Sequence, residues 1–238
     1  MGMFRFKQFQ IDDTDCAMKT GTDGVLLGAW ASPGAGSRVI DAGCGSGLIS
    51  LMLAQRDDSL LITSVEIDTP AAETARSNVA NSPWAERIEV VNQDILDMEF
   101  PSQCHIVSNP PFFVETLRSP DPSRALARHG DTLNVESLID LAGRLAGSED
   151  QLSGLSFIAP ASSLDDILFR LSLKRLAPIR VCEVIPRAGR KPVRVLIEAA
   201  PERDVTSPCV YTSLVLRNAD GSPGDDYRSL TSDFYLKF

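Results

Sequence analysis

The sequence predicts an α/β protein built on a doubly wound, mostly parallel sheet. Short runs of branched apolar residues alternate with segments of helical periodicity along the 238 residues, which is the pattern of strands joined by helical crossovers. No internal repeat and no linker rich in Gly, Ser or Pro interrupts the chain, so we expect a single domain over residues 1–238. Hydrophobic residues make up 43% and charged residues 23%, as in a globular protein with a sizeable core.

The individual elements are predicted from periodicity. Residues 48–55, for example, carry apolar side chains at i, i+3 and i+4, which indicates a helix. The predicted strands are 38–42, 60–66, 88–92, 104–108, 155–159, 179–184 and 193–199, with a last extended stretch at 210–216. The predicted helices are 48–55, 71–81, 135–145 and 164–176. Because ligands of such sheets bind at the carboxyl ends of the strands, we expect the site in the loops after Ala42, Glu66, Asn92 and Ser108.

Charge is distributed unevenly along the chain. The formal net charge of −9 argues against a protein that binds nucleic acid over its whole surface. Residues 1–150 hold 11 basic and 22 acidic residues, whereas residues 151–203 hold 9 basic and 5 acidic ones. A polyanion would therefore have to meet a local patch, such as the basic residues of 187–194. On composition alone, these cations are more simply the solvated face of a loop and a strand edge.

The cysteines, histidines and apolar runs favour a cytoplasmic protein without a metal. Five cysteines, with no C-x-x-C pair, are typical of reduced and mostly buried thiols. Only His105 and His129 could supply imidazole ligands, so we expect no zinc site. No apolar run approaches the ~18 residues of a membrane span. The first ten residues also lack the apolar centre of a signal peptide.

A glycine-rich loop joins the first of these strands to its helix, with the sequence Asp41-Ala-Gly-Cys-Gly-Ser-Gly47. Gly43, Gly45 and Gly47 allow the backbone to approach a ligand that a Cβ would exclude. The spacing is G-x-G-x-G rather than the dinucleotide fingerprint G-x-G-x-x-G. Glu66 ends the next strand, where a carboxylate can accept both hydroxyls of a ribose. A tight turn and a solvated glutamate explain each feature singly, but together they predict an adenosine-type ligand.

A second acid follows the third strand. Asp94 could accept a hydrogen bond from the amino group of an adenine. The alternative interpretation is an aspartate that caps a helix or a turn.

The sharpest signal is the turn Ser108-Asn-Pro-Pro-Phe-Phe113, directly after a strand. Its two prolines fix φ and remove two N–H donors, so carbonyls remain as the polar groups of the backbone. The Asn109 side-chain oxygen and the Pro110 carbonyl can accept both hydrogens of a planar exocyclic amine. That geometry favours a pyramidal nitrogen whose lone pair can attack. Phe112 offers a flat face for the base, worth ~1–3 kcal/mol. The alternative is a plain Pro-Pro turn.

These motifs resemble class I S-adenosylmethionine-dependent methyltransferases that modify an exocyclic nitrogen. More narrowly, segments spread over nearly the whole chain are similar to the bacterial tRNA1(Val) (adenine-37-N6)-methyltransferase family. One departure is that many relatives carry Tyr where Phe112 stands, and Asn-Pro-Pro-Phe also occurs in enzymes that methylate N2 of guanine. The similar segments are Phe6-Lys-Gln-Phe9, residues 16–30, residues 82–88 and Leu230-Thr-Ser-Asp-Phe-Tyr-Leu236.

The resemblance implies a Rossmann-like class I methyltransferase fold. Its sheet would have seven strands, the last of them antiparallel, and an N-terminal extension over residues 1–35 would close over the cofactor. The implied reaction is methyl transfer from S-adenosylmethionine to N6 of an adenine in the anticodon loop of a tRNA, by an enzyme that we expect to act as a monomer.

The resemblance also implies roles for individual residues. Those expected near the cofactor are Lys19, Thr20, Asp41, Gly43, Gly45, Gly47, Glu66 (ribose), Asp94 (adenine) and Asn109. Those expected at the reacting amine are Asn109, Pro110 and Phe112. The segment 19–23 would close over the methionine carboxylate, or it is only a helix N-terminus with Thr22 as the cap. Candidates for phosphate contacts are Arg118, Arg124, Arg128, Arg190 and Lys191.

Three other function classes share some of these features. Protein glutamine N5-methyltransferases also use an Asn-Pro-Pro-aromatic turn, because a side-chain amide is another poorly nucleophilic nitrogen. A nicotinamide-dependent oxidoreductase shares the fold, although the glycine spacing and the Asn109 turn speak against it. A non-catalytic RNA-binding module would need Arg124 and Arg190 but not Glu66.

Overall fold

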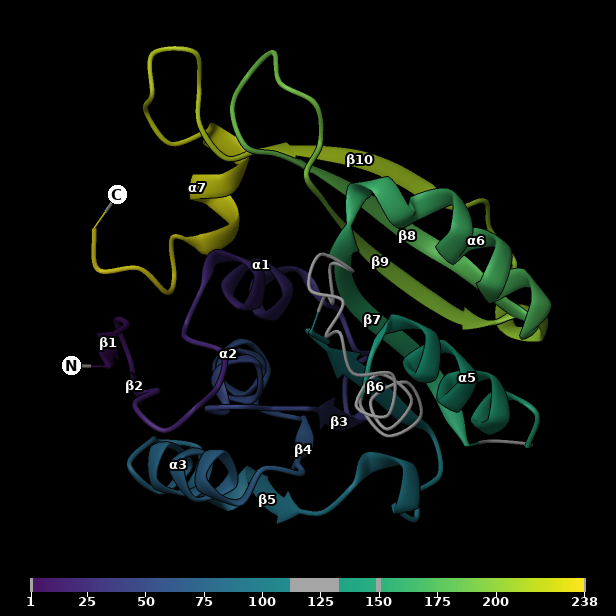
Figure 1. Ribbon diagram of the computed structural model, residues 1–238, viewed down its shortest axis with the longest axis horizontal. Helices are drawn as coiled ribbons and strands as arrows, with labels where there is room; N and C mark the ends of the chain where they lie inside the picture. The colour runs from purple at the N-terminus through teal and green to yellow at the C-terminus, as the bar shows by residue number, and fades with distance from the viewer. Residues whose placement is uncertain (1, 112–132, 149–150, 238) are drawn as a thin grey trace, which may run out of the picture.

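The computed structural model describes residues 2–111, 133–148 and 151–237, and Figure 1 shows a twisted sheet with helices on both faces. Eight strands of the described residues form this main sheet, in the order β10-β8-β9-β7-β6-β3-β4-β5. They are β3 (Arg38–Ala42), β4 (Leu61–Glu66), β5 (Ile88–Asn92), β6 (Cys104–Ser108), β7 (Leu152–Pro160), β8 (Leu176–Ile185), β9 (Arg194–Pro201) and β10 (Val210–Val215). The α/β class and the mostly parallel sheet are confirmed.

The strand count differs from the prediction by one. Strands β3 to β9 are the seven expected strands, and β9, the last of them in the chain, is antiparallel to both β7 and β8. The last extended stretch, predicted at 210–216, is an eighth strand, β10 (Val210–Val215), parallel to β8 at the edge of the sheet. Four of its six residues are exposed, so the segment lacks the apolar alternation that marks a half-buried strand.

The helices cover the two faces of the sheet. Helices α1, α2 and α7, with the end of α3, pack on one face, and α5 and α6 pack on the other (Figure 1). The helices are α1 (Thr22–Trp30), α2 (Leu48–Arg56), α3 (Thr69–Ala80), α5 (Val135–Ala146), α6 (Leu164–Leu173) and α7 (Asp225–Thr231). Short 3-10 helices are η1 (Ala85–Arg87), η2 (Ile95–Asp97), η3 (Ala161–Ser163) and η4 (Glu202–Asp204).

Helix α1 packs directly against α2. A Cβ at Gly28 would lie 2.8 Å from the sulfur of Met52, and one at Gly24 would lie 3.1 Å from Leu48. Glycine therefore permits the close approach that holds the first turn of α1 beside the first turn of α2. Residues 24–29 are all buried, so this segment has no polar face and its helical period could not be predicted from the sequence.

The two ends of the chain meet. A small antiparallel hairpin of β1 (Met3–Arg5) and β2 (Gln10–Asp12) begins the described chain. The amide of Lys7 donates to the carbonyl of Phe234 at 2.8 Å, and Phe6 forms a β-bridge with Tyr235. The Phe9 ring contacts Trp84 with centroids 5.8 Å apart. Three of the four segments that carry the family resemblance therefore form one aromatic cluster.

Candidate functional site

The loops after β3 and β6 meet the start of α1 around one cavity, at the carboxyl ends of the parallel strands. Its volume is about 490 Å³, within the ~300–1,000 Å³ typical of small-molecule sites. A wider hollow of about 1070 Å³ runs along the edge strand β5, away from this cavity. The cavity is lined by residues 18–24, residues 43–46, Leu48, Ile49 and Asn109.

The glycine loop adopts a backbone that other residues rarely adopt. Gly43, Gly45 and Gly47 have φ angles of 69°, 54° and 80°, all in the left-handed region that glycine enters without penalty. The amides of Gly43 and Cys44 donate to the carbonyl of Val65 at 2.9 and 3.0 Å, which fixes the loop to the end of β4. The loop thus presents its backbone to the cavity, as its sequence predicts.

Glu66 lies against this loop. One carboxylate oxygen, Oε2, accepts a hydrogen bond from the Gly45 amide at 2.8 Å, and Oε1 accepts one from the Asp68 amide at 3.0 Å. A carboxylate has about four acceptor positions, so two remain for a ligand. The strand-end acid and the glycine loop, 21 residues apart, form one structural unit.

Asp41 lies beneath the loop and does not line the cavity. It is fully buried, and its Oδ2 accepts hydrogen bonds from the amide and the hydroxyl of Ser50 at 3.1 and 2.6 Å. Burial raises the pKa of Asp41 to about 6, although the hydrogen bonds from Ser50 act in the opposite direction. In this structure the Asp41 carboxylate holds the first turn of α2 against β3.

Asp94 caps a short helix. Its Oδ1 accepts a hydrogen bond from the Leu96 amide at 2.9 Å, at the start of η2. This is the capping geometry that the sequence offered as the alternative to a cofactor contact. Asp94 does not belong to the cavity lining, and its second carboxylate oxygen is the group that could still accept from a ligand.

Asn109 borders the cavity from the end of β6. The hydroxyl of Ser108 donates to the carbonyl of Ala42 at 2.7 Å, which ties the turn to the start of the glycine loop. Pro110 is buried. The Asn109 Oδ1 atom is buried without a hydrogen-bond partner among the described residues, an arrangement that native proteins rarely leave unsatisfied. Phe112 lies outside the described residues.

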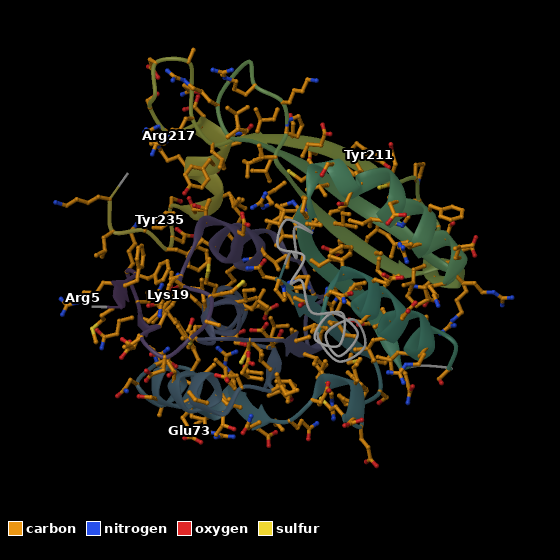
Figure 2. The ribbon with its side chains drawn as sticks, viewed as in Figure 1. Arg5, Lys19, Glu73, Tyr211, Arg217 and Tyr235 are labelled. Carbon is orange, nitrogen blue, oxygen red and sulfur yellow. The ribbon has the colours of Figure 1, made fainter. Side chains whose placement is uncertain are left out.

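Lys19 and Thr20 close the cavity on the N-terminal side. The Lys19 ammonium, labelled in Figure 2, donates to the carbonyls of Asp13 and Thr14 at 2.6 and 2.8 Å. The Thr20 amide donates to the Asp13 carboxylate at 2.7 Å. Thr20 Oγ1 is buried and has no partner within the described ranges.

The segment 19–23 contains a helix N-terminus, since α1 begins at Thr22, and the same segment lines the cavity. Gly21, rather than Thr22, is the N-cap of α1, and it supplies no capping side chain. The first amides of the helix are therefore available to a ligand.

Two polar contacts, one buried and one about one third exposed, were not predicted from the sequence. The Asn78 side chain donates to the carbonyls of Asp12 and Ser46 at 2.8 and 2.9 Å and accepts from the Asp12 amide at 2.9 Å. Asn78 thereby joins the N-terminal hairpin to the glycine loop. Asp23 lines the cavity and accepts a hydrogen bond from Arg194 at 2.8 Å. Isolated polar residues on helices have no motif that would identify such contacts.

The basic candidates fall into two groups. Arg190 and Lys191 are exposed in the loop between β8 and β9. Arg194, which the sequence groups with them, instead pairs with Asp23 and is only partly exposed. The other candidates, Arg118, Arg124 and Arg128, lie outside the described residues.

Within the described part of the chain, no three His, Cys, Asp or Glu side chains gather as a metal site would require. None of the helices described combines the length and the hydropathy needed to cross a membrane.

Comparisons with known proteins agree with the geometry. Residues 19–131 match the model of the methyltransferase small domain family. A curated tRNA1(Val) (adenine(37)-N6)-methyltransferase from Aeromonas hydrophila is 43% identical over 98% of this chain and 97% of its own length. One of the same name from Bacteroides thetaiotaomicron is 41% identical with the same coverage.

Solved structures share the fold at lower identity. A predicted O-methyltransferase from Agrobacterium tumefaciens superposes with a TM-score of 0.66 at 20% identity, covering 89% of this chain and 96% of its own. The hMettl16 catalytic domain in complex with the MAT2A 3′UTR hairpin 1 reaches 0.51 at 18% identity, covering 73% and 67%. Identity and coverage with the curated relatives establish that this chain belongs to the tRNA1(Val) (adenine(37)-N6)-methyltransferase family.

Proposed function

We propose that this protein transfers a methyl group from S-adenosylmethionine to N6 of adenine 37 in tRNA1(Val). The family supports the reaction, and one observation carries it in this chain: the acceptor oxygen of Asn109 is buried at the cavity without a partner among the described residues. An exocyclic amine is a donor that would satisfy it.

The residues around the cavity fit S-adenosylmethionine. Glu66 has two acceptor positions left for the ribose hydroxyls, next to a glycine loop without side chains in the way. Thr20 Oγ1 and the amides at the start of α1, which no capping side chain occupies, suit the methionine carboxylate. When bound, the cofactor supplies a methyl group on a positively charged sulfur.

Asn109 and Pro110 are the residues proposed to bind and orient the substrate nitrogen. The Asn109 oxygen and the Pro110 carbonyl accept the two hydrogens of the amine, which draws its lone pair out of conjugation with the ring. No general base is required at this step, because the transfer depends on alignment. Holding the reactants in an attack geometry can supply ~7–11 kcal/mol. Phe112 is proposed to stack on the base.

The N-terminal extension, residues 1–35, is proposed to cover the cofactor. Its segment up to Thr20 is held by three contacts already described: Asn78 to Asp12, Thr20 to Asp13, and Lys19 to the Asp13 and Thr14 carbonyls. These contacts hold the segment that leads to residues 18–20 at the rim of the cavity, where the methionine end of the cofactor would lie.

The target base must leave its stack, at a cost of a few kcal/mol that is smallest in a loop. Arg190 and Lys191 are proposed to bind phosphates of the tRNA, together with Arg118, Arg124 and Arg128. We expect the enzyme to act as a monomer in the cytoplasm, where its tRNA substrate is found.

Labelled S-adenosylmethionine and total tRNA test the proposal. After incubation and digestion, we expect the label in N6-methyladenosine, and tRNA1(Val) with adenine 37 replaced by guanine should remain unlabelled. Label in N2-methylguanosine, or in a protein added as the alternative substrate, would overturn the assignment. Binding of NAD in place of S-adenosylmethionine, measured by calorimetry, would also contradict it.

A further inference from the structure

A group of exposed cations lies outside the cavity, on two neighbouring loops. The loops are residues 186–193, between β8 and β9, and residues 216–224, between β10 and α7. We name their exposed basic side chains, Arg187, Arg190, Lys191 and Arg217, the two-loop surface. Asp220 is the one carboxylate of these loops, in a chain whose net charge is −9. The charge of this surface is therefore opposite to that of the molecule as a whole.

Hydrogen bonds hold the two loops together. The Ala188 amide donates to the Arg217 carbonyl at 2.8 Å, and the Leu216 amide donates to the Ile185 carbonyl at 2.9 Å. The Arg187 guanidinium reaches the carbonyl of Ala219. The loops stand side by side above α7 and α1 in Figure 1, and Arg217 lies at the end of the molecule opposite Glu73 in Figure 2. The two loops that carry the four cations are thus fixed relative to one another.

A groove of about 670 Å³ runs along the first loop, lined by Pro186, residues 187–191 except Ala188, and Val193. Its lining combines an exposed valine with guanidinium and ammonium groups. No side-chain hydrogen bond or ion pair holds Arg190 or Lys191 within the described chain. A lining of apolar and cationic groups suits the sugar and phosphate groups of a nucleic-acid backbone.

The groove is next to the cavity. Val193 lines the groove, and its neighbour Arg194 bonds to Asp23, which lines the cavity. The Val193 amide also donates to Val184 at 2.9 Å, which fixes this junction to β8. A nucleic acid in the groove would therefore be held beside the site where a base enters.

We propose that the two-loop surface binds the phosphodiester backbone of the RNA stem that presents the target base, with Arg217 and Arg187 as contacts beyond Arg190 and Lys191. This inference rests on the proposed function, which supplies an RNA substrate. The surface contributes affinity and orientation, whereas Asn109 and the cavity determine which atom is methylated.

The test uses a hairpin RNA with the sequence of the anticodon stem-loop and the full-length variants Arg217→Glu and Lys191→Glu. Each is expected to weaken RNA binding about tenfold at 100 mM salt and to reduce the slope of log Kd against log salt by about 1. The affinity for S-adenosylhomocysteine, measured by calorimetry, should stay within twofold. Lys191→Glu is the second variant because its side chain supports no loop contact.

Arg38→Glu is the matched control, since Arg38 is exposed at the amino end of β3, opposite the cavity. If Arg38→Glu weakened RNA binding as much as the test variants do, the effect would come from overall charge and the proposal would be overturned. Unchanged RNA binding in both test variants would overturn it as well. A wild-type protein that binds RNA through this surface but methylates no tRNA would contradict the proposed function and leave the surface standing.

Discussion

The cavity and the two-loop surface are built in opposite ways. At the cavity, buried groups and backbone geometry set the shape: a loop of left-handed glycines, a carboxylate that bonds to this loop from outside the cavity lining, and an amide oxygen without a partner among the described residues. At the two-loop surface, exposed cations create a field, and hydrogen bonds fix only the loops that carry them. Changes at the cavity should therefore act through geometry and be insensitive to salt, whereas changes at the loops should be strongly salt-dependent.

The largest expected effect is at Asn109. Replacing Asn109 by Ala removes one oriented acceptor, so turnover should fall ~10²–10³-fold while the affinity for S-adenosylmethionine stays close to that of the wild type. Single-turnover kinetics at saturating RNA and isothermal calorimetry measure the two quantities. Asn81→Ala, at the exposed C-cap of α3, is the control. Turnover near the wild-type value would remove Asn109 from the chemistry.

The second largest effect is expected for Asp41→Asn, on the free energy of unfolding of the cofactor-free protein. The pKa of Asp41 is raised to about 6 from 3.8 in the folded state, so the folded protein holds this proton more tightly than the unfolded chain does. The contribution of Asp41 to stability therefore falls as pH rises from about 4 to 6 and does not change further above that range. Asp41→Asn lacks this loss and should gain roughly 2–3 kcal/mol relative to the wild type between pH 4 and pH 7.

Urea unfolding at several pH values measures this difference. The buried His105, whose pKa is lowered to about 3 by burial, acts in the opposite direction but is common to both proteins and cancels. Asp57→Asn is a useful control, because hydrogen bonds from Ser59 lower the pKa of Asp57, so its pH dependence should have the opposite sign. A stability difference that does not change with pH would contradict the buried environment of Asp41.

A substitution at Glu66 should change the affinity for the cofactor but not the affinity for RNA. Glu66→Gln keeps the shape and one acceptor oxygen but loses the charge, so the affinity for S-adenosylmethionine should fall about tenfold, near the lower end for a hydrogen bond to a charged group. RNA affinity should not change, and the effect should persist in 0.5 M salt. Glu89→Gln, exposed on the neighbouring strand, is the control. A salt-dependent loss of RNA binding would show that the two regions are not separate.

The sequence predicts the cavity better than its surroundings, for physical reasons. Gly43 and Asn109, which line the cavity, and Glu66, which bonds to its glycine loop, belong to residue types that only a few backbone or chemical roles require. Each is next to a strand with a clear pattern. The strands at 38–42, 88–92 and 104–108 have the predicted bounds. By contrast, α1 is buried on all sides and has no polar face to reveal its period.

The contacts that join distant segments could not be predicted. The Asn78 side chain donates hydrogen bonds to the carbonyls of Asp12 and Ser46, which are 66 and 32 residues away. Nothing local in the sequence distinguishes Asn78 from an ordinary helical asparagine. The edge strand β10 is mostly exposed, and its place in the sheet depends on its pairing with β8. Such features follow from tertiary packing rather than from local preference.

The smallest expected effect is at the contact between the two regions, the ion pair of Arg194 and Asp23. Both side chains are about one third exposed, so the pair should contribute only about 0.5–1 kcal/mol to stability. Because Asp23 lines the cavity, Asp23→Asn and Arg194→Gln should each weaken cofactor binding two- to threefold, and the double variant no more than either. This non-additivity in a double-mutant cycle is the signature of a shared contact. The exposed pair Glu73–Arg76 on α3 should leave cofactor binding unchanged in the same cycle. Additive losses at Asp23 and Arg194 would mean that the groove and the cavity are neighbours without coupling.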